Sequence, residues 1–312
     1  MLNYHGPVWI DLVDPTAEEV ARVEEATGLR IPTREALSEV ESSSRLRRLK
    51  GGLSLSTPMI TFEQADSQLK PLGFLLTSNH LVTVRFHDLR AYSSAAERLK
   101  EDGEGGDPAE TFVVLLEELV DSLADALEEM AADLDALSSR IFDFDVRARS
   151  SRRQDEPPPR RRDLALRRIL RAISRRGKVL GKVRASLLGL ERIVPFVASA
   201  CDGLELSDDG RFDTIRKDIE SLDEFETRLA ENVQFLLDAA LGLINIEQNN
   251  VFRVLTVVSV VGVPPTLIAS MYGMNFKHMP ELEWTYGYPY ALGLIVLSAL
   301  IPIVYFRIKG WF

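Results

Sequence analysis

Hydrophobic and polar residues follow different periods in successive parts of the chain. Near the start, apolar residues recur at every second position in "VWIDLV" (8–13) and "LSLSTPMITF" (53–62), which is typical of strands. The stretch "LGFLLTSNHLVTVRF" (72–86) predicts a hairpin. A helix is predicted over "TAEEVARVEEATG" (16–28), with Thr16 near its N-cap and a closing glycine. Residues 1–107 are therefore interpreted as a mixed α/β domain.

After a linker rich in Gly, Asp and Glu, the apolar period changes to steps of three and four. One stripe is formed by Leu116, Leu119, Leu123, Leu127, Met130, Leu134, Leu137 and Ile141, and the other faces of this helix are acidic. Three prolines within 149–162 interrupt the pattern, and a basic helix follows over 163–190. These patterns predict an antiparallel pair of helices over 108–195, the first acidic and the second basic. Two solvated helix faces are the alternative, because exposed ion pairs contribute little individually.

The third region contains one very long helical pattern and two uncharged runs. The absence of proline between Arg211 and Val263 favours a single helix over about 212–271, on the order of 90 Å long. Residues 254–276 and 284–306 carry no charge, and each run exceeds the roughly 20 residues that span a bilayer as helix. We therefore expect a stalk helix continuing into a first span (196–271), a loop (272–287), a second span (288–307) and a tail (308–312).

Composition and charge narrow the functional class. The chain has 312 residues and a formal net charge of −10, which argues against a nucleic-acid partner. With one Cys and four His, the chain is not expected to form a disulfide framework or a thiolate metal site. The sequence also shows no pairing of a nucleophile with a base, so we do not expect an enzyme. The N-terminal residues lack a secretory signal pattern. Arg253, Arg307 and Lys309 flank the uncharged runs and predict a multi-pass protein of the inner (plasma) membrane with both termini cytoplasmic.

Small polar residues are aligned on one face of the first predicted span. Thr256, Ser259, Thr266 and Ser270 are separated by three, seven and four residues, with Val263 between them. Polar groups in hydrocarbon must face protein or water, so this stripe indicates either helix packing or a pore. Two spans cannot enclose a channel, and a pore would require a ring of subunits that turn this face to a common axis.

The residues between and within the two spans resemble the CorA family of divalent-cation channels. The resemblance rests on Gly273-Met274-Asn275 after the first span, on Met279-Pro280-Glu281-Leu282, and on the long helix that precedes them. It implies a homopentameric funnel: an α/β N-terminal cytosolic domain, a long helical stalk and two C-terminal transmembrane helices. It also implies Mg²⁺ as the substrate and as a regulatory ligand, with no other cofactor.

The resemblance assigns roles to individual positions. Gly273, Met274 and Asn275 would form the selectivity filter, with Asn275 binding hydrated Mg²⁺. The expected pore-lining residues are Asn249, Phe252, Leu255, Thr256, Ser259, Val263, Thr266 and Ser270, although the periodicity prefers Thr256 to Leu255. Asp238 would join a regulatory Mg²⁺ site between subunits, with a partner among Glu35, Glu39 and Glu41. Glu281 would raise the local cation concentration, or would be a solvated loop acid.

The function expected from these features is passive, potential-driven uptake of Mg²⁺, with Co²⁺ and Ni²⁺ as further candidate ions. A zinc transporter of the related branch is the alternative within transport. The Met-Pro-Glu-Leu sequence and the low content of His and Cys favour the harder cation. A membrane-anchored coiled-coil scaffold that transports nothing is the alternative from another class.

Overall fold

The computed structural model describes most of the chain as two units. The described residues are 2–5, 8–39, 41, 45–63, 66–102, 106–150, 159–199, 210–275, 279–280 and 283–311. One unit comprises Met1–Arg152 with Arg168–Asp238, and the other comprises Arg153–Arg167 with Ala239–Phe312. The predicted residues Glu281 and Leu282 and most of the proline-rich stretch lie outside the described residues.

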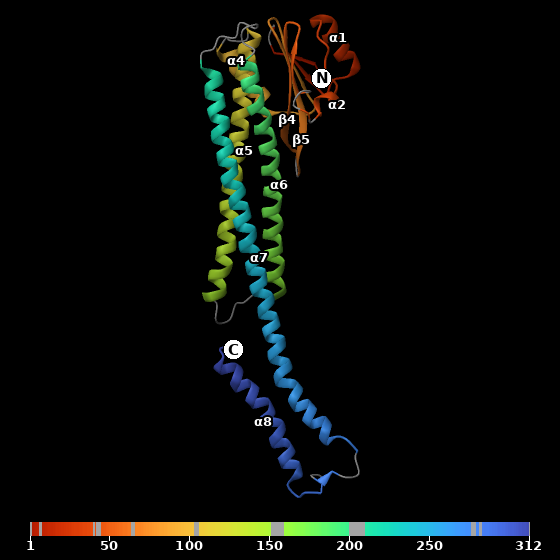
Figure 1. The fold of residues 1–312 in the computed structure, drawn as a ribbon, viewed down its shortest axis with the longest axis vertical. Coiled ribbons are helices and arrows are strands. Elements are labelled where there is room, and N and C mark those ends of the chain that lie inside the picture. Colours follow the sequence, from red (N-terminus) through yellow and green to blue (C-terminus); the bar gives the residue numbers. More distant parts are fainter. Residues whose placement is uncertain are drawn as a thin grey trace. The chain divides into compact units, whose positions relative to one another are not determined.

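The first unit contains a six-stranded sheet with the order β1-β2-β6-β5-β4-β3 (Figure 1). The strands are β1 (Leu2–Tyr4), β2 (Trp9–Val13), β3 (Leu46–Leu49), β4 (Gly52–Glu63), β5 (Asp66–Thr77) and β6 (Leu81–Arg85). All neighbouring strands are antiparallel except β2 and β6, which are parallel. The predicted strands 8–13 and 53–62 and the hairpin 72–86 are confirmed.

One face of the sheet is covered by α1 (Ala17–Thr27) and α2 (Arg34–Leu37). A capping box starts α1: the Glu19 amide donates to Thr16 Oγ1 at 3.3 Å, and the Thr16 amide donates to Glu19 Oε2 at 3.0 Å. The helix ends at Gly28, which has a φ of 69° and so adopts the left-handed conformation that glycine favours. The predicted helix 16–28 is thus confirmed, and its Val23 is buried with Leu75 and Val82 of the sheet.

Three further helices follow the sheet along the chain, and all but the start of the third belong to the first unit. They are α4 (Arg90–Asp102), α5 (Pro108–Ser150) and α6 (Pro159–Ala198). Phe112 of α5 contacts Phe74 of β5 edge-on, with ring centroids 5.3 Å apart, and so anchors α5 on the sheet. Arg176 Nε of α6 donates to Asp133 Oδ2 of α5 at 3.0 Å. The two helices run antiparallel in Figure 1, and this ion pair joins the acidic helix to the basic one.

Helix α7 (Arg211–Tyr272) is a single helix of 62 residues. The prediction of one helix over about 212–271 is confirmed, although the helix contains Pro264 and Pro265. In the first unit, its apolar stripe is buried in the bundle with α5 and α6, at Phe212, Ile215, Ile219, Leu229, Val233 and Leu236. In the second unit, α7 is followed by α8 (Gly287–Ile308), which contains the second predicted span.

Candidate functional site

Two helices within the described ranges are long and apolar enough to cross a membrane. They are α7, through its C-terminal part, and α8. Of their most apolar windows, 0% and 6% is buried, so neither behaves as the core helix of a soluble fold. The exposed side chains of these two windows must therefore be covered by lipid, by other chains or by water.

Partial burial along the span marks one face on α7 and one on α8, and we infer that these two faces are turned toward each other. Within the span, the partly covered residues of α7 are Val257, Val261, Pro264, Pro265, Ile268 and Tyr272. On α8 they are Ala291, Leu294, Ile295, Ser298, Ala299 and Pro302, followed by the buried Phe306. Both sets recur at steps of three and four, the spacing of one helix face packed on another.

A shallow groove of about 400 Å³ runs along the opposite face of α7. It is lined by Val258, Ser259, Gly262, Val263, Thr266, Leu267 and Ser270. At 100° per residue, Ser259 and Thr266 lie about half a turn from Val257 and Pro264. The polar stripe recognised in the sequence is therefore on the side of α7 that α8 leaves open. A single chain provides no partner for this face among its described residues.

The remaining predicted pore-lining positions lie on or beside the same face. Phe252, Leu255 and Val263 are 64%, 61% and 61% exposed. Leu255 and Thr256 are consecutive, so they diverge by 100° and flank the line through Phe252 and Ser259. The structure thus does not select one of them over the other. Asn249 is also exposed, but it lies one turn before Arg253, at the edge between this face and the side turned toward α8.

Two hydroxyl groups of this stripe are bonded within the helix. Thr256 Oγ1 donates to the Phe252 carbonyl, and Thr266 Oγ1 donates to the Gly262 carbonyl, both at 2.8 Å. Each proton is therefore used by the backbone, and the oxygen lone pairs remain for an outside donor. Thr266, which lines the groove, presents an acceptor to it.

The segment after α7 begins with the predicted selectivity filter. The Gly273 amide donates to the carbonyl oxygens of Ala269 and Ser270 at 3.0 and 3.2 Å, and the Met274 amide donates to Met271 at 3.3 Å. Asn275 is exposed at the end of this turn. The φ of Gly273 is outside the left-handed region. The turn closes by ordinary helical bonds, and a Cβ atom here would lie 3.3 Å from the Ala269 oxygen.

The predicted regulatory residues are not brought together within one chain. Asp238 is exposed on α7, and its Oδ1 accepts a bond from Gln234 Nε2 at 3.2 Å. Glu35, Glu39 and Glu41 belong to the α/β region and are exposed. No three His, Cys, Asp or Glu side chains among the described residues are grouped to hold a metal ion. A regulatory site at Asp238 would therefore need a ligand from a second subunit.

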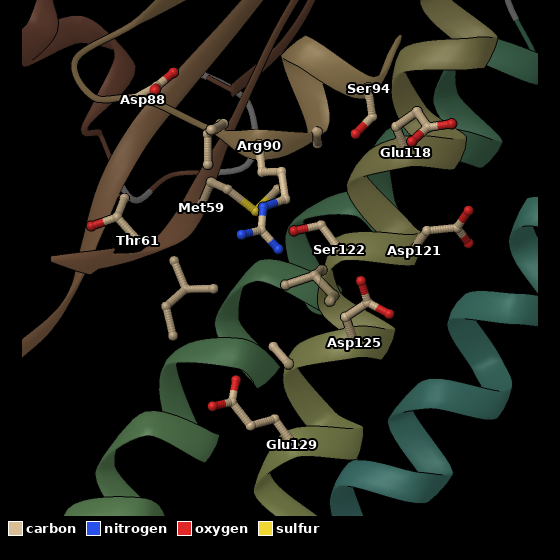
Figure 2. A pocket seen from close by; sticks show the side chains of 15 residues that line it. Met59, Thr61, Asp88, Arg90, Ser94, Glu118, Asp121, Ser122, Asp125 and Glu129 are labelled. Atoms are coloured by element: carbon tan, nitrogen blue, oxygen red, sulfur yellow. The ribbon is translucent and has the colours of Figure 1, made fainter. Parts of the chain in front are cut away.

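An acidic pocket of about 390 Å³ in the first unit was not predicted as a site (Figure 2). Its carboxylates are Asp88, before α4, and Glu118, Asp121, Asp125 and Glu129 of α5. Figure 2 shows the Arg90 side chain projecting between the sheet and α5, toward Ser122. The acidic face of α5 was visible in the sequence, but its convergence with the segment 88–94 depends on the tertiary fold.

Charge crowding distinguishes two neighbouring acids on α5. Burial, followed by the nearby carboxylates of Asp218 and Glu117, raises the pKa of Asp121. Burial would also raise the pKa of Glu117, but the guanidinium groups of Arg211 and Arg98 outweigh it, and the pKa lies below its usual value. Arg211 Nη2 lies 2.8 Å from Glu117 Oε2, and Arg98 Nη2 lies 2.9 Å from the same atom. The two guanidinium groups thus balance the charge of the ionised Glu117, whereas Asp121 is surrounded by an excess of negative charge.

The long helix α7 and the exposed apolar helix α8 have the length and composition of membrane spans, and the chain is therefore classed as a membrane protein. The family model described as "CorA-like Mg2+ transporter protein" matches residues 4–308. The chain belongs to this family.

Individual relatives agree with this assignment. The chain is 34% identical over 307 residues to the "Magnesium transport protein CorA" of Yersinia pseudotuberculosis serotype I, covering 97% of this chain and 92% of the relative. It is 34% identical over 310 residues to the protein of the same name from Haemophilus influenzae, with the same coverage. The solved structure of the CorA magnesium transporter from Methanocaldococcus jannaschii has a TM-score of 0.76 at 20% identity, and the match covers 98% of this chain and 92% of that one. This last similarity concerns the fold alone.

Proposed function

We propose that this protein is a homopentameric channel for passive, potential-driven uptake of Mg²⁺, with Co²⁺ and Ni²⁺ as further candidate ions. The single observation that carries the proposal is the open polar groove on α7, opposite the face packed by α8. Five copies that turn this face inward would line a water-filled path with the residues from Asn249 to Ser270. Family membership and the names of the relatives support Mg²⁺ as the ion.

The chemistry of the filter suits a hydrated divalent ion. Mg²⁺ dehydrates reluctantly and demands near-ideal octahedral geometry. A ring of neutral oxygens, from the Asn275 side chains and nearby backbone carbonyls, would accept hydrogen bonds from the ion's water shell. A ring of carboxylates would bind the ion more tightly and release it more slowly. Glu281, outside the described residues, would act only by raising the local cation concentration.

The inner part of the path would combine apolar constrictions with one polar site. Phe252, Leu255 and Val263 are exposed apolar side chains of α7 that would narrow the path. Thr266 would offer a hydroxyl oxygen whose proton is already bonded to Gly262. A hydrated ion would pass such an acceptor without exchanging its waters, because water donates to the oxygen directly.

Cytosolic Mg²⁺ would regulate this channel through Asp238 at the interface between subunits. Loss of the ion would leave like charges facing each other and would weaken the closed arrangement. Asp238→Lys should therefore change the dependence of flux on internal Mg²⁺, with Asp213→Lys, another exposed acid of α7, as the matched control. An unchanged dependence in Asp238→Lys would remove this assignment.

The decisive experiment is Mg²⁺ flux into liposomes that contain the purified protein and low internal Mg²⁺. A potassium diffusion potential, negative inside, should increase wild-type flux. Asn275→Ala should lower flux strongly, whereas Thr285→Ala, in the turn before α8, should not. A scaffold without transport predicts no flux from any of these proteins, and a zinc transporter predicts preferred uptake of Zn²⁺ over Mg²⁺.

A further inference from the structure

The C-terminal end of α8 is closed by a specific backbone arrangement. The Trp311 amide donates to the Phe306 carbonyl at 3.0 Å, and the Gly310 amide donates to the Arg307 carbonyl at 3.2 Å. Gly310 has a φ of 68°, the left-handed conformation that glycine adopts readily. These two bonds around a left-handed residue constitute a Schellman motif. The motif reverses the chain direction and directs residue 311 back toward the last turn of the helix.

The reversal places the Trp311 indole on Phe306. The two rings are stacked, with centroids 5.2 Å apart and an interplanar angle of 21°. Phe306 is itself 5% exposed, although most of α8 is open. Trp311 is therefore held from two sides, by the backbone bonds of the cap and by an anchored aromatic ring. It remains 40% exposed, so these contacts cover only part of the indole.

A cation from α7 makes a third contact with Trp311. The guanidinium carbon of Arg253 lies 5.8 Å from the centroid of the Trp311 ring, within the range of a cation–π interaction. Arg253 directly follows Phe252, at the inner end of the proposed ion path. It precedes Val257 by four residues and hence shares with it the side of α7 turned toward α8. The positive charge thus points away from the groove.

We propose that the capped end of α8 is a positioning device: Trp311 holds the charge of Arg253 out of the ion path at its inner end. This inference rests on the proposed channel function. Arg253 is long enough to reach around α7 when its guanidinium is unrestrained. Each unit positive charge about 8 Å from a divalent ion in water lowers the local concentration of that ion roughly five-fold, and the five copies of Arg253 in a pentamer would lower it further. Trp311 acts through Arg253 and does not itself contact the ion.

The test is a charge-rescue experiment on the full-length protein in liposomes. Trp311→Ala should lower Mg²⁺ influx by at least about five-fold at low ionic strength, and less at high salt because the repulsion is screened. Adding Arg253→Gln to Trp311→Ala should restore influx to near the wild-type value. Trp311→Phe, which keeps an aromatic face, should retain most of it. Ile308→Ala, at an 81% exposed neighbouring position, is the matched control and should leave influx unchanged.

Rescue by removal of the charge separates positioning from support of the fold. If Trp311 merely stabilised α8, the double variant would be no better than Trp311→Ala, and this result would overturn the proposal. Influx unchanged in Trp311→Ala would overturn it as well.

A second measurement tests the contact even if the wild-type protein proves not to conduct. Thermal unfolding of the detergent-solubilised protein should give non-additive shifts for the same two substitutions. The coupling should be on the order of 1–2 °C, as expected for a partly exposed cation–π pair in a chain of this size. Additive shifts would overturn the contact, whereas absence of wild-type flux with coupling present would overturn only the channel function.

Discussion

Arg85 and Asp11 form a buried ion pair across the parallel strands β2 and β6. Arg85 Nη2 lies 2.9 Å from Asp11 Oδ2, and the two side chains are 6% and 0% exposed. Asp11 Oδ1 also accepts a bond from Thr83 Oγ1 at 2.8 Å. On its other side, Arg85 Nη1 lies 3.0 Å from Asp88 Oδ1, at the acidic pocket. The core of the sheet thus orients a carboxylate of that pocket.

Asp11→Asn should destabilise the protein strongly. The substitution leaves the Arg85 charge buried without its main counter-charge, which costs about 3–5 kcal/mol in comparable buried pairs. Asp213→Asn is the control, because its pair with Arg216 is exposed and should contribute less than about 1 kcal/mol. Thermal unfolding of the purified full-length protein measures both. Equal effects of the two substitutions would mean that the buried pair has no special role.

Gly189 of α6 is predicted to be required for the docking of that helix on β4. A Cβ atom at this position would overlap Thr57 Oγ1 and would lie 3.0 Å from Thr57 Cβ. Gly189→Ala should therefore destabilise the fold by about 1–3 kcal/mol, despite the better helix propensity of alanine. Gly181→Ala, on the same helix with nothing within 4 Å, should instead stabilise by up to about 1 kcal/mol. A similar change at both glycines would contradict this view of the contact.

Long periodic patterns made the helices α5, α6 and α7 predictable, because each keeps an apolar stripe over many turns. Helix α4 was missed, since its buried residues include the small Ala91, Ala95 and Ala96, which give a weak hydrophobic signal. The parallel pairing of Trp9 with Leu81 also lay beyond sequence reasoning. It joins strands some seventy residues apart, and no local turn signals it.

The candidate site likewise has features that the sequence predicts and features that depend on tertiary packing. The polar stripe and the Gly-Met-Asn sequence are local patterns, so they could be recognised before the structure was known. Which face of α7 lies toward α8 depends on the packing of two separate helices. The contact of Arg253 with Trp311 was not predicted, because the cap that directs Trp311 backward depends on the conformation of Gly310. A glycine near the end of an apolar helix was the only available signal.

Asp121→Asn should make the protein slightly more stable at neutral pH. Burial and neighbouring carboxylates raise the pKa of Asp121 in the folded state, so its contribution to stability is lost as pH rises through that folded pKa. A permanently neutral side chain avoids this loss. Because Asp121 is exposed on one side, the gain should be about 0.3 kcal/mol after solvent screening. Below the ordinary carboxyl pKa of about 4, the difference should disappear.

The same substitution should weaken the response of stability to Mg²⁺. A divalent cation near Asp121 and Asp218 relieves their repulsion, so millimolar Mg²⁺ should raise the unfolding temperature of wild type more than that of Asp121→Asn. Asp135→Asn, an exposed acid farther along α5, is the control and should leave the Mg²⁺ response intact. An identical response in all three proteins would indicate that the pocket does not attract the cation.

Thr266→Val should lower Mg²⁺ flux by several-fold without changing the fold. The substitution keeps the shape of the side chain and removes the oxygen that faces the groove. One lost hydrogen bond to the water shell corresponds to about 0.5–1.5 kcal/mol. Thr266→Ser should retain flux, because it preserves the acceptor. Ser298→Ala is the matched control: its hydroxyl donates to the Ile295 carbonyl at 2.8 Å on α8, outside the groove. If Ser298→Ala lowered flux as much as Thr266→Val, the groove would be a packing surface, and the ion path would have to lie elsewhere.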